Sequence, residues 1–229
     1  MSLCRLAPVG DWPAAVLWDL DGTLVDTEPA WIAAEIDLAE RHGRTWTAED
    51  GIALVGHDLL DSGRIMRERL DLPLEPEQIV ADLVGAVEKL VRESTTWRPG
   101  ARELLAATRA AGVPCALVTM SYRSLVVPLV ASLPEDTFDA VVTGDEVTRG
   151  KPHPDPYLAA AAALGLEPGA CLAVEDSPTG AASAAAAGCT VLVVPHHVPV
   201  PPAPGLVFAD SLAGLDPPAL AALRRRTSL

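Results

Sequence analysis

The sequence is organised around one stretch near its amino end, Leu17-Trp18-Asp19-Leu20-Asp21-Gly22-Thr23-Leu24-Val25-Asp26. The apolar residues 14–18 before the first aspartate predict a buried strand. Asp19 and Asp21 lie two positions apart, so both side chains can point to the same place at the end of that strand. Two converging carboxylates repel each other unless a cation or a shared proton lies between them, and their oxygens suit Mg²⁺. Taken alone, the stretch is also consistent with a strand followed by an acidic turn without a ligand.

The overall composition limits the partners of the protein. With 229 residues, the chain can form one sizeable core or a core with a smaller insert. Its formal net charge of -14 argues against nucleic acid and against an anionic membrane as partners. No stretch approaches the roughly 18–20 apolar residues of a membrane span, and we see no secretory leader, so we expect a cytoplasmic protein. The four cysteines form no C-x-x-C pair, and we expect buried reduced thiols.

The pattern of apolar residues divides the chain into two kinds of sequence. Residues 28–97 show helical periodicity, with helices expected over 30–41, over 58–70 and from 75 onward. From residue 99, helices alternate with short apolar strands, expected over 114–118, 138–142, 170–174 and 191–194. This alternation predicts an α/β fold with a Rossmann-like parallel sheet and helices on both faces. We therefore expect a core of residues 1–27 and 98–229 with an inserted all-helical domain of residues 28–97.

Polar residues follow several of the predicted strands. Thr119-Met120-Ser121 follows the strand over 114–118, and Glu175-Asp176-Ser177 follows the strand over 170–174. Because the carboxyl ends of parallel strands meet at one edge, these groups should lie near Asp19. Each group also has a simpler interpretation, with Thr119 as a strand-end or helix-capping residue and the acidic pair as a helix start. Ser121 could cap the following helix or touch phosphate, and we favour the cap.

Four segments together resemble the motifs of the haloacid dehalogenase-like superfamily, in its sugar phosphatase and β-phosphoglucomutase branch. They are Asp19 to Glu28, Val118 to Ser121, Gly150-Lys151-Pro152-His153-Pro154-Asp155-Pro156, and Val174 to Ser177. The resemblance implies that Asp19 is the nucleophile and Asp21 the general acid and base. It implies phosphate binding by the Thr119 hydroxyl, by the backbone of Met120 and Gly22, and by Lys151. It also implies a Mg²⁺ site of Asp19, Asp21, Asp176 and Glu175, the last directly or through water.

The resemblance thus implies a phosphoric monoester hydrolase: a Mg²⁺-dependent phosphatase of small phosphorylated metabolites, with sugar phosphates as the expected class, acting through an aspartyl phosphate. The helical insert would be the cap that closes over the site. A phosphomutase is an alternative, although Trp31 stands where β-phosphoglucomutases carry a histidine. A further alternative is a regulatory or binding protein that has this fold but no catalytic activity. The cap residues His57, Asp58, Arg64 and Arg67 could contact substrate or simply form a helix surface. The sequence does not determine the oligomeric state; we favour a monomer.

Overall fold

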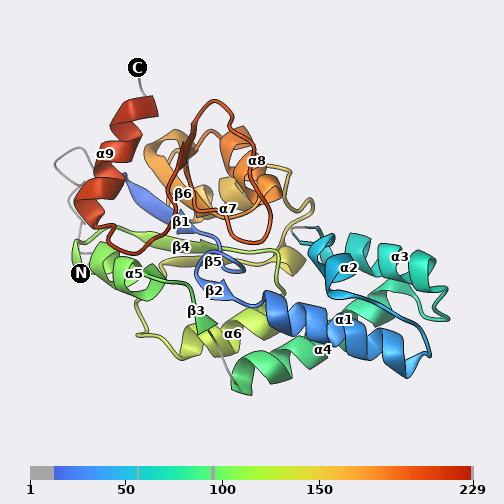
Figure 1. The fold of residues 1–229 in the computed structure, drawn as a ribbon. Coiled ribbons are helices and arrows are strands. Elements are labelled where there is room, and N and C mark those ends of the chain that lie inside the picture. The colour runs from blue at the N-terminus through green and yellow to red at the C-terminus, as the bar shows by residue number, and fades with distance from the viewer. Residues whose placement is uncertain (1–12, 56, 94–95, 228–229) are drawn as a thin grey trace.

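The strand that precedes Asp19 lies in the middle of a six-stranded parallel sheet (Figure 1). The computed structural model describes residues 13–55, 57–93 and 96–227. The order of the strands across the sheet is β5-β4-β1-β6-β7-β8. Their bounds are Ala15–Trp18 for β1, Cys115–Val118 for β4, Ala140–Val142 for β5, Cys171–Glu175 for β6, Thr190–Val193 for β7 and Leu206–Phe208 for β8. The predicted α/β class is confirmed.

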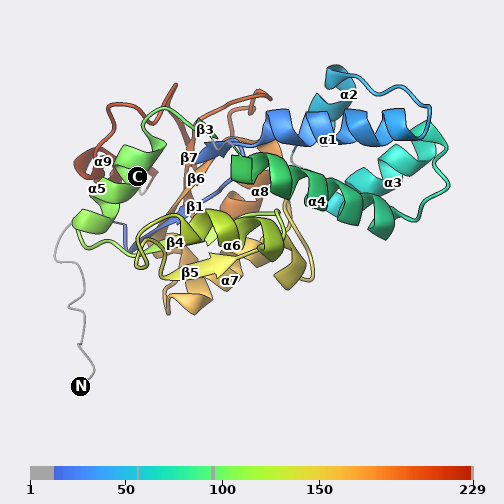
Figure 2. The same ribbon diagram turned by 90° about the horizontal axis from the view of Figure 1, so that it is seen from below.

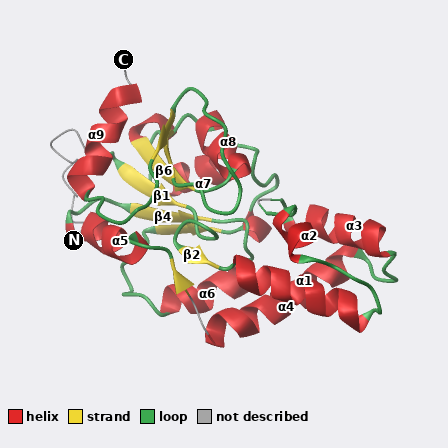
Figure 3. Ribbon diagram, viewed as in Figure 1, coloured by secondary structure: helices red, strands yellow, loops and turns green. Residues whose placement is uncertain are grey.

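Helices cover both faces of this sheet, as Figure 3 shows by the red ribbons around the yellow strands. Val16 and Trp18 of β1 pack into one apolar cluster with α5, α6 and α9, whereas Ala15 and Leu17 pack into a second cluster with α7 and α8. This alternation follows from the two-residue period of a strand. The helices are α5 (Ala101–Ala110), α6 (Arg123–Ala131), α7 (Asp155–Ala163), α8 (Pro178–Ala186) and α9 (Pro217–Thr227), with 3₁₀ turns at Gly144–Glu146 and Pro168–Ala170.

Residues between β2 and β3 form a group of four helices beside the carboxyl edge of the sheet (Figure 2). They are α1 (Glu28–Arg41), α2 (Ala48–Ile52), α3 (Leu59–Leu70) and α4 (Pro76–Glu93). Their apolar faces share a separate core that includes the fully buried Leu38, Met66 and Ile79. Strands β2 (Val25–Asp26) and β3 (Thr96–Trp97) pair antiparallel, so the chain enters and leaves the insert side by side. We propose that the core and cap domains divide here, as the sequence suggests.

Several elements differ from expectation. The short elements α2, β2, β3 and β8 were not predicted from the pattern. Pro128 lies inside α6, where its missing N–H costs one helical hydrogen bond. Cys115, Cys171 and Cys189 are buried thiols as predicted, and Cys4 lies outside the described residues.

Across the described ranges, none of the helices has the length and apolarity that crossing a bilayer requires.

Candidate active site

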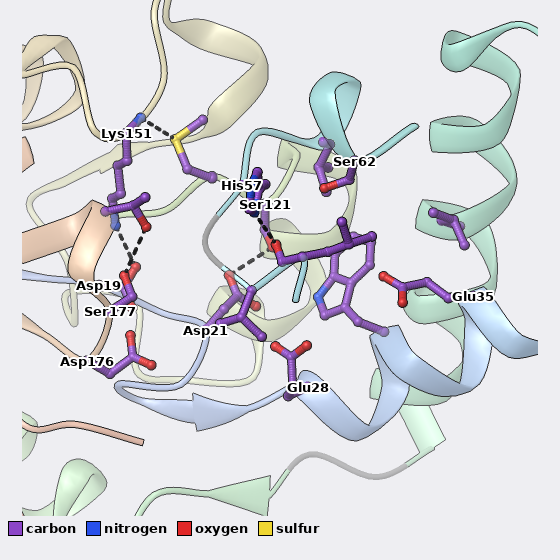
Figure 4. Close-up of a pocket in the computed structure, with 17 residues that line it drawn as sticks. Asp19, Asp21, Glu28, Glu35, His57, Ser62, Ser121, Lys151, Asp176 and Ser177 are labelled. Atoms are coloured by element: carbon purple, nitrogen blue, oxygen red, sulfur yellow. Dashed lines mark hydrogen bonds and ion pairs between the residues drawn. The ribbon is translucent and has the colours of Figure 1, made fainter. Parts of the chain in front are cut away.

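Side chains from three neighbouring strands meet at the carboxyl edge of the sheet. Asp19 directly follows β1, Thr119 directly follows β4, and Asp176 directly follows β6. A single pocket is lined by Asp19, Asp21, Met120, Lys151 and Asp176 (Figure 4). Thr119 bonds to Asp21, Glu175 bonds to Lys151, and Gly22 lies against Asp176. The structure therefore places all eight predicted site residues together.

The ammonium group of Lys151 joins the strands below this pocket. Its Nζ donates hydrogen bonds to Asp19 Oδ1 at 2.6 Å, to Glu175 Oε1 at 2.6 Å and to the Val118 carbonyl at 3.0 Å. An ammonium has three protons, so all three are used. Burial would lower the pKa of Lys151, but the adjacent carboxylates of Asp19 and Glu175 hold this pKa above its ordinary value. The lysine is thus a fixed positive charge.

Glu175 anchors this lysine. Its side chain is fully buried, and Oε1 also accepts a hydrogen bond from the Tyr157 hydroxyl at 2.5 Å. Oε2 accepts longer bonds from the Asp176 backbone N–H and the Ser177 hydroxyl, at 3.3 and 3.4 Å. Sequence reasoning missed Tyr157, although a phenol within the alanine-rich α7 is a signal for a specific polar contact. Through these bonds Glu175 holds Lys151 in place and lies beside the carboxylate of Asp176.

Asp19 has one oxygen held and one oxygen without a partner. Oδ1 accepts from Lys151, whereas Oδ2 is buried and has no hydrogen-bond partner. Burial, reinforced by the negative charge of Glu175 and opposed by Lys151, raises the pKa of Asp19 to about 7. Burial together with Asp19 and Glu175 also holds the pKa of Asp176 well above its ordinary value. Asp19, Glu175 and Asp176 offer oxygens that all lie within 4.8 Å of one another, a set of hard ligands that a cation such as Mg²⁺ fits.

Gly22 lets the loop after β1 lie directly against this acidic group. Its φ is +90°, and a Cβ at this position would lie 2.1 Å from Asp176 Oδ2. A side chain here would therefore displace the carboxylate. Thr23, the next residue, has its hydroxyl 3.4 Å from Asp176 Oδ1.

Asp21 is surrounded by hydroxyl groups. Thr27 donates to its Oδ1 at 2.6 Å, and Thr119 and Ser121 each donate to its Oδ2 at 2.8 Å. The expectation that Ser121 caps a helix is wrong: α6 begins after Tyr122 and has no side-chain cap, because the Ser121 hydroxyl is committed to Asp21. Thr27 was missed, since its role depends on the turn that places it beside Asp21 and at the start of α1.

The insert supplies the opposite wall of the pocket. Its lining side chains include Glu28, Trp31 and Glu35 from α1, with His57 and Ser62 nearby (Figure 4). Of the four cap residues proposed as substrate contacts, His57 alone lines this pocket. Asp58 instead caps α3 by accepting the Leu60 N–H.

The two cap arginines proposed as substrate contacts are turned to other partners. Arg64 pairs with Asp61, and Arg67 pairs with Glu75, both on the exposed surface. Each guanidinium thus satisfies a neighbouring carboxylate on the helix surface, which is the simpler of the two interpretations that the sequence allowed.

The sequence matches the family model of the haloacid dehalogenase-like hydrolases over residues 13–188. The chain belongs to this family. Hexitol phosphatase A of Escherichia coli is 38% identical to this hydrolase over 182 residues, covering 78% of this chain and 81% of the relative. Protein CbbY of Rhodobacter capsulatus is 37% identical over 195 residues, covering 80% and 86%. The crystal structure of CbbY from Rhodobacter sphaeroides in complex with phosphate superposes with a TM-score of 0.78 at 28% identity, covering 88% of this chain and 95% of that one.

Family membership and these relatives confirm two predictions from the sequence. The resemblance to the haloacid dehalogenase-like superfamily is confirmed by the family model. The enzyme class, a phosphoric monoester hydrolase, is confirmed by that model together with the phosphatases among the relatives.

The arrangement around Lys151 predicts a large loss of stability when its charge is removed. In Lys151→Met, Asp19 and Glu175 would face each other in a buried site without a cation, so we expect the free energy of unfolding to fall by about 3 kcal/mol in urea at neutral pH. The matched control is Arg149→Met, which removes an exposed ion pair with Asp155 and should cost less than about 1 kcal/mol. Equal losses in the two variants would contradict this account.

Proposed function

We propose that this hydrolase is a Mg²⁺-dependent phosphatase of small phosphorylated carbohydrates, and that its reaction passes through an aspartyl phosphate on Asp19. The observation that carries the proposal is the buried Oδ2 of Asp19, which has no hydrogen-bond partner although Asp19 lines the pocket. Lys151 fixes Oδ1, so Oδ2 is the oxygen left to attack phosphorus. The phosphatases among the relatives support the substrate class.

The other residues have separate roles in this reaction. Lys151 offsets the charge that three carboxylates would otherwise present to an anionic substrate. The backbone N–H of Met120 would bind a phosphoryl oxygen, and the Thr119 hydroxyl would do so after turning its proton from Asp21 Oδ2 to the substrate. The N–H of Gly22, expected from the sequence to bind phosphate, instead donates to the Val25 carbonyl at 2.8 Å. Asp21 lines the pocket beside Asp19 and would protonate the leaving oxygen, then take a proton from the water that hydrolyses the aspartyl phosphate.

Asp19 and Asp176 would hold the Mg²⁺ ion directly, with the backbone carbonyl of Asp21 as a further ligand. The two oxygens of Glu175 already accept four hydrogen bonds, so we place Glu175 at the ion through water. When bound, the ion supplies positive charge that neutralises the phosphoryl group and the carboxylates around it. The Asp21 side chain bonds to three hydroxyls and is not one of the clustered carboxylates, so it would transfer protons after exchanging one of these bonds for the substrate.

Hydrolysis is favoured over phosphoryl transfer between two sugar positions. Trp31 lines the pocket at the position where the sequence motif of β-phosphoglucomutases carries a histidine. An indole donates one N–H and cannot carry a proton to or from Asp21. We therefore propose that water reaches the aspartyl phosphate once the first product leaves. We further propose that the enzyme works as a monomer in the cytoplasm.

Replacing the nucleophile tests the proposal. Asp19→Asn keeps the shape of the side chain but removes its nucleophilic oxygen, so release of inorganic phosphate from hexose and hexitol phosphates should fall by about a thousandfold or more. The control is Asp37→Asn, an exposed position on α1, which should keep its activity. If Asp19→Asn retained more than a tenth of the rate of the unaltered enzyme, the assignment would be wrong.

Removing the metal tests the proposed dependence of the reaction on Mg²⁺. EDTA should abolish phosphate release, Mg²⁺ should restore it, and excess Ca²⁺ should inhibit because it imposes a looser coordination. Mg²⁺ should also raise the melting temperature of the unaltered protein, and this shift should vanish in Asp176→Asn. Full turnover in the presence of chelator would rule out a metal-dependent reaction.

A further inference from the structure

The wall of the pocket that faces the leaving group carries acidic groups where an anionic substrate would require basic ones. Glu28 and Glu35, both on α1, line this wall together with Trp31, Leu54 and Leu83. Figure 4 shows both carboxyl groups on the side of the pocket formed by the insert, facing the space in front of Asp21. Among the described lining residues, Lys151 is the one lysine or arginine, and its three protons already bond to the protein.

Five arginines of the insert are turned to carboxylates outside the pocket lining. The pairs are Arg41 with Asp37, Arg44 with Asp71, Arg64 with Asp61, Arg67 with Glu75 and Arg69 with Asp50. The one other basic side chain of the lining is His57, whose Nδ1 lies 3.1 Å from the Leu54 carbonyl oxygen. Since a carbonyl oxygen only accepts, that contact takes the proton on Nδ1. Among the described lining residues, no lysine or arginine is therefore left to bind a second anionic group.

Burial and one hydrogen bond hold the Glu35 side chain in a fixed position in this wall. Its side chain is 5% exposed, and its Oε2 accepts a hydrogen bond from the indole N–H of Trp46 at 2.9 Å. Gly51 allows this approach, because a Cβ at position 51 would lie 2.8 Å from the same oxygen. A buried carboxyl group with one fixed oxygen presents the other in a defined direction. Burial, together with the neighbouring acids, also raises the pKa of Glu28 to about 8.

We infer that this pocket selects a leaving group that is uncharged and polyhydroxylated, so that the substrate is a neutral sugar or sugar alcohol with a single phosphate, and that Glu28 and Glu35 determine this specificity. The inference rests on the proposed phosphatase function. A hydroxyl both donates and accepts, so it can pair with either protonation state of a carboxyl group. The apolar side chains of Trp31 and Leu54 can cover the C–H surface between the hydroxyls.

The same wall works against substrates with a second anionic group. A carboxylate or a second phosphate on the leaving group would come to rest beside Glu28 and Glu35, with no free described lysine or arginine to compensate. An ionised acid repels the second anion through its like charge, and a protonated acid offers it no compensating positive charge, so the wall disfavours such substrates in either form.

Substrate comparison on the full chain with Mg²⁺ tests the inference. Phosphate release is measured from glucose 6-phosphate and glucitol 6-phosphate, and from fructose 1,6-bisphosphate and 2-phosphoglycolate. The first two should have kcat/KM values at least about 100-fold above the last two. Values for the bisphosphate or phosphoglycolate within about threefold of glucose 6-phosphate would overturn the inference. A kcat/KM for glucosamine 6-phosphate about tenfold above that for glucose 6-phosphate would also overturn the inference, because the wall would then bind a cation.

Two variants test the roles of the acids. Glu35→Gln keeps an acceptor for the Trp46 N–H, and Glu28→Gln changes a group with more solvent contact, so a folding defect in one leaves the other to decide. Each should lower the ratio of kcat/KM for glucose 6-phosphate to that for 2-phosphoglycolate by about tenfold, mainly through KM. Glu40→Gln, an exposed acid on the same helix, is the matched control and should leave the ratio unchanged. An unchanged ratio in both pocket variants would overturn the assignment.

Failure of the inference and failure of the proposed function give different results. p-Nitrophenyl phosphate serves as a reference substrate that reports the core chemistry. If it and every sugar phosphate remain intact while the protein is folded and bound to Mg²⁺, the phosphatase proposal is wrong and the inference is wrong with it. If phosphate is released but anionic substrates are preferred, only the inference is wrong.

Discussion

The three hydrogen bonds of the Lys151 ammonium are the interaction on which the site depends. They connect Asp19 after β1, the carbonyl of Val118 at the end of β4, and Glu175 at the end of β6. These strands are neighbours in the sheet, so a single side chain fixes the relative positions of three strand ends. In a protein of net charge -14, this buried cation also provides the local positive charge that makes a phosphate site possible.

The second organising contact is the set of hydroxyls around Asp21. Thr119 and Ser121 belong to the loop after β4, whereas Thr27 lies at the point where the chain enters the insert. One carboxylate thus bonds to the sheet edge and to the first residue before α1. Movement of the helices relative to the sheet would change these bonds, and we expect the orientation of Asp21 to depend on the position of the insert.

The sequence predicts the parts of the site that follow from topology. Asp19, Thr119 and Asp176 each follow a strand of a parallel sheet, and this alone places them at one edge. Lys151 required the resemblance to a family, because it lies on a connection rather than at a strand end. The sequence could not show that Ser121 and Thr27 bond to Asp21 or that Tyr157 bonds to Glu175. Those contacts depend on side-chain directions that only the packed structure determines.

The pocket wall formed by the insert was harder to predict for a different reason. Arg64 and Arg67 were reasonable candidates for binding an anion, but each forms an ion pair with a nearby acid. The sequence alone does not show which nearby acid an arginine pairs with. Glu35 was missed because an acid on an amphipathic helix is ordinarily exposed, whereas here Trp46 and Gly51 make room for it inside. Short elements such as β2 and β3 exist through their pairing with each other, which no local pattern signals.

The central claim is that the free oxygen of Asp19 becomes phosphorylated during turnover. Quenching the enzyme with acid while it hydrolyses hexitol phosphate, followed by reduction with borohydride, converts an aspartyl phosphate into homoserine. Peptide mass spectrometry should then find homoserine at position 19, and at no other carboxylate, in a fraction that grows with substrate occupancy. Steady phosphate release with an unmodified Asp19, or with homoserine at another position, would contradict the account.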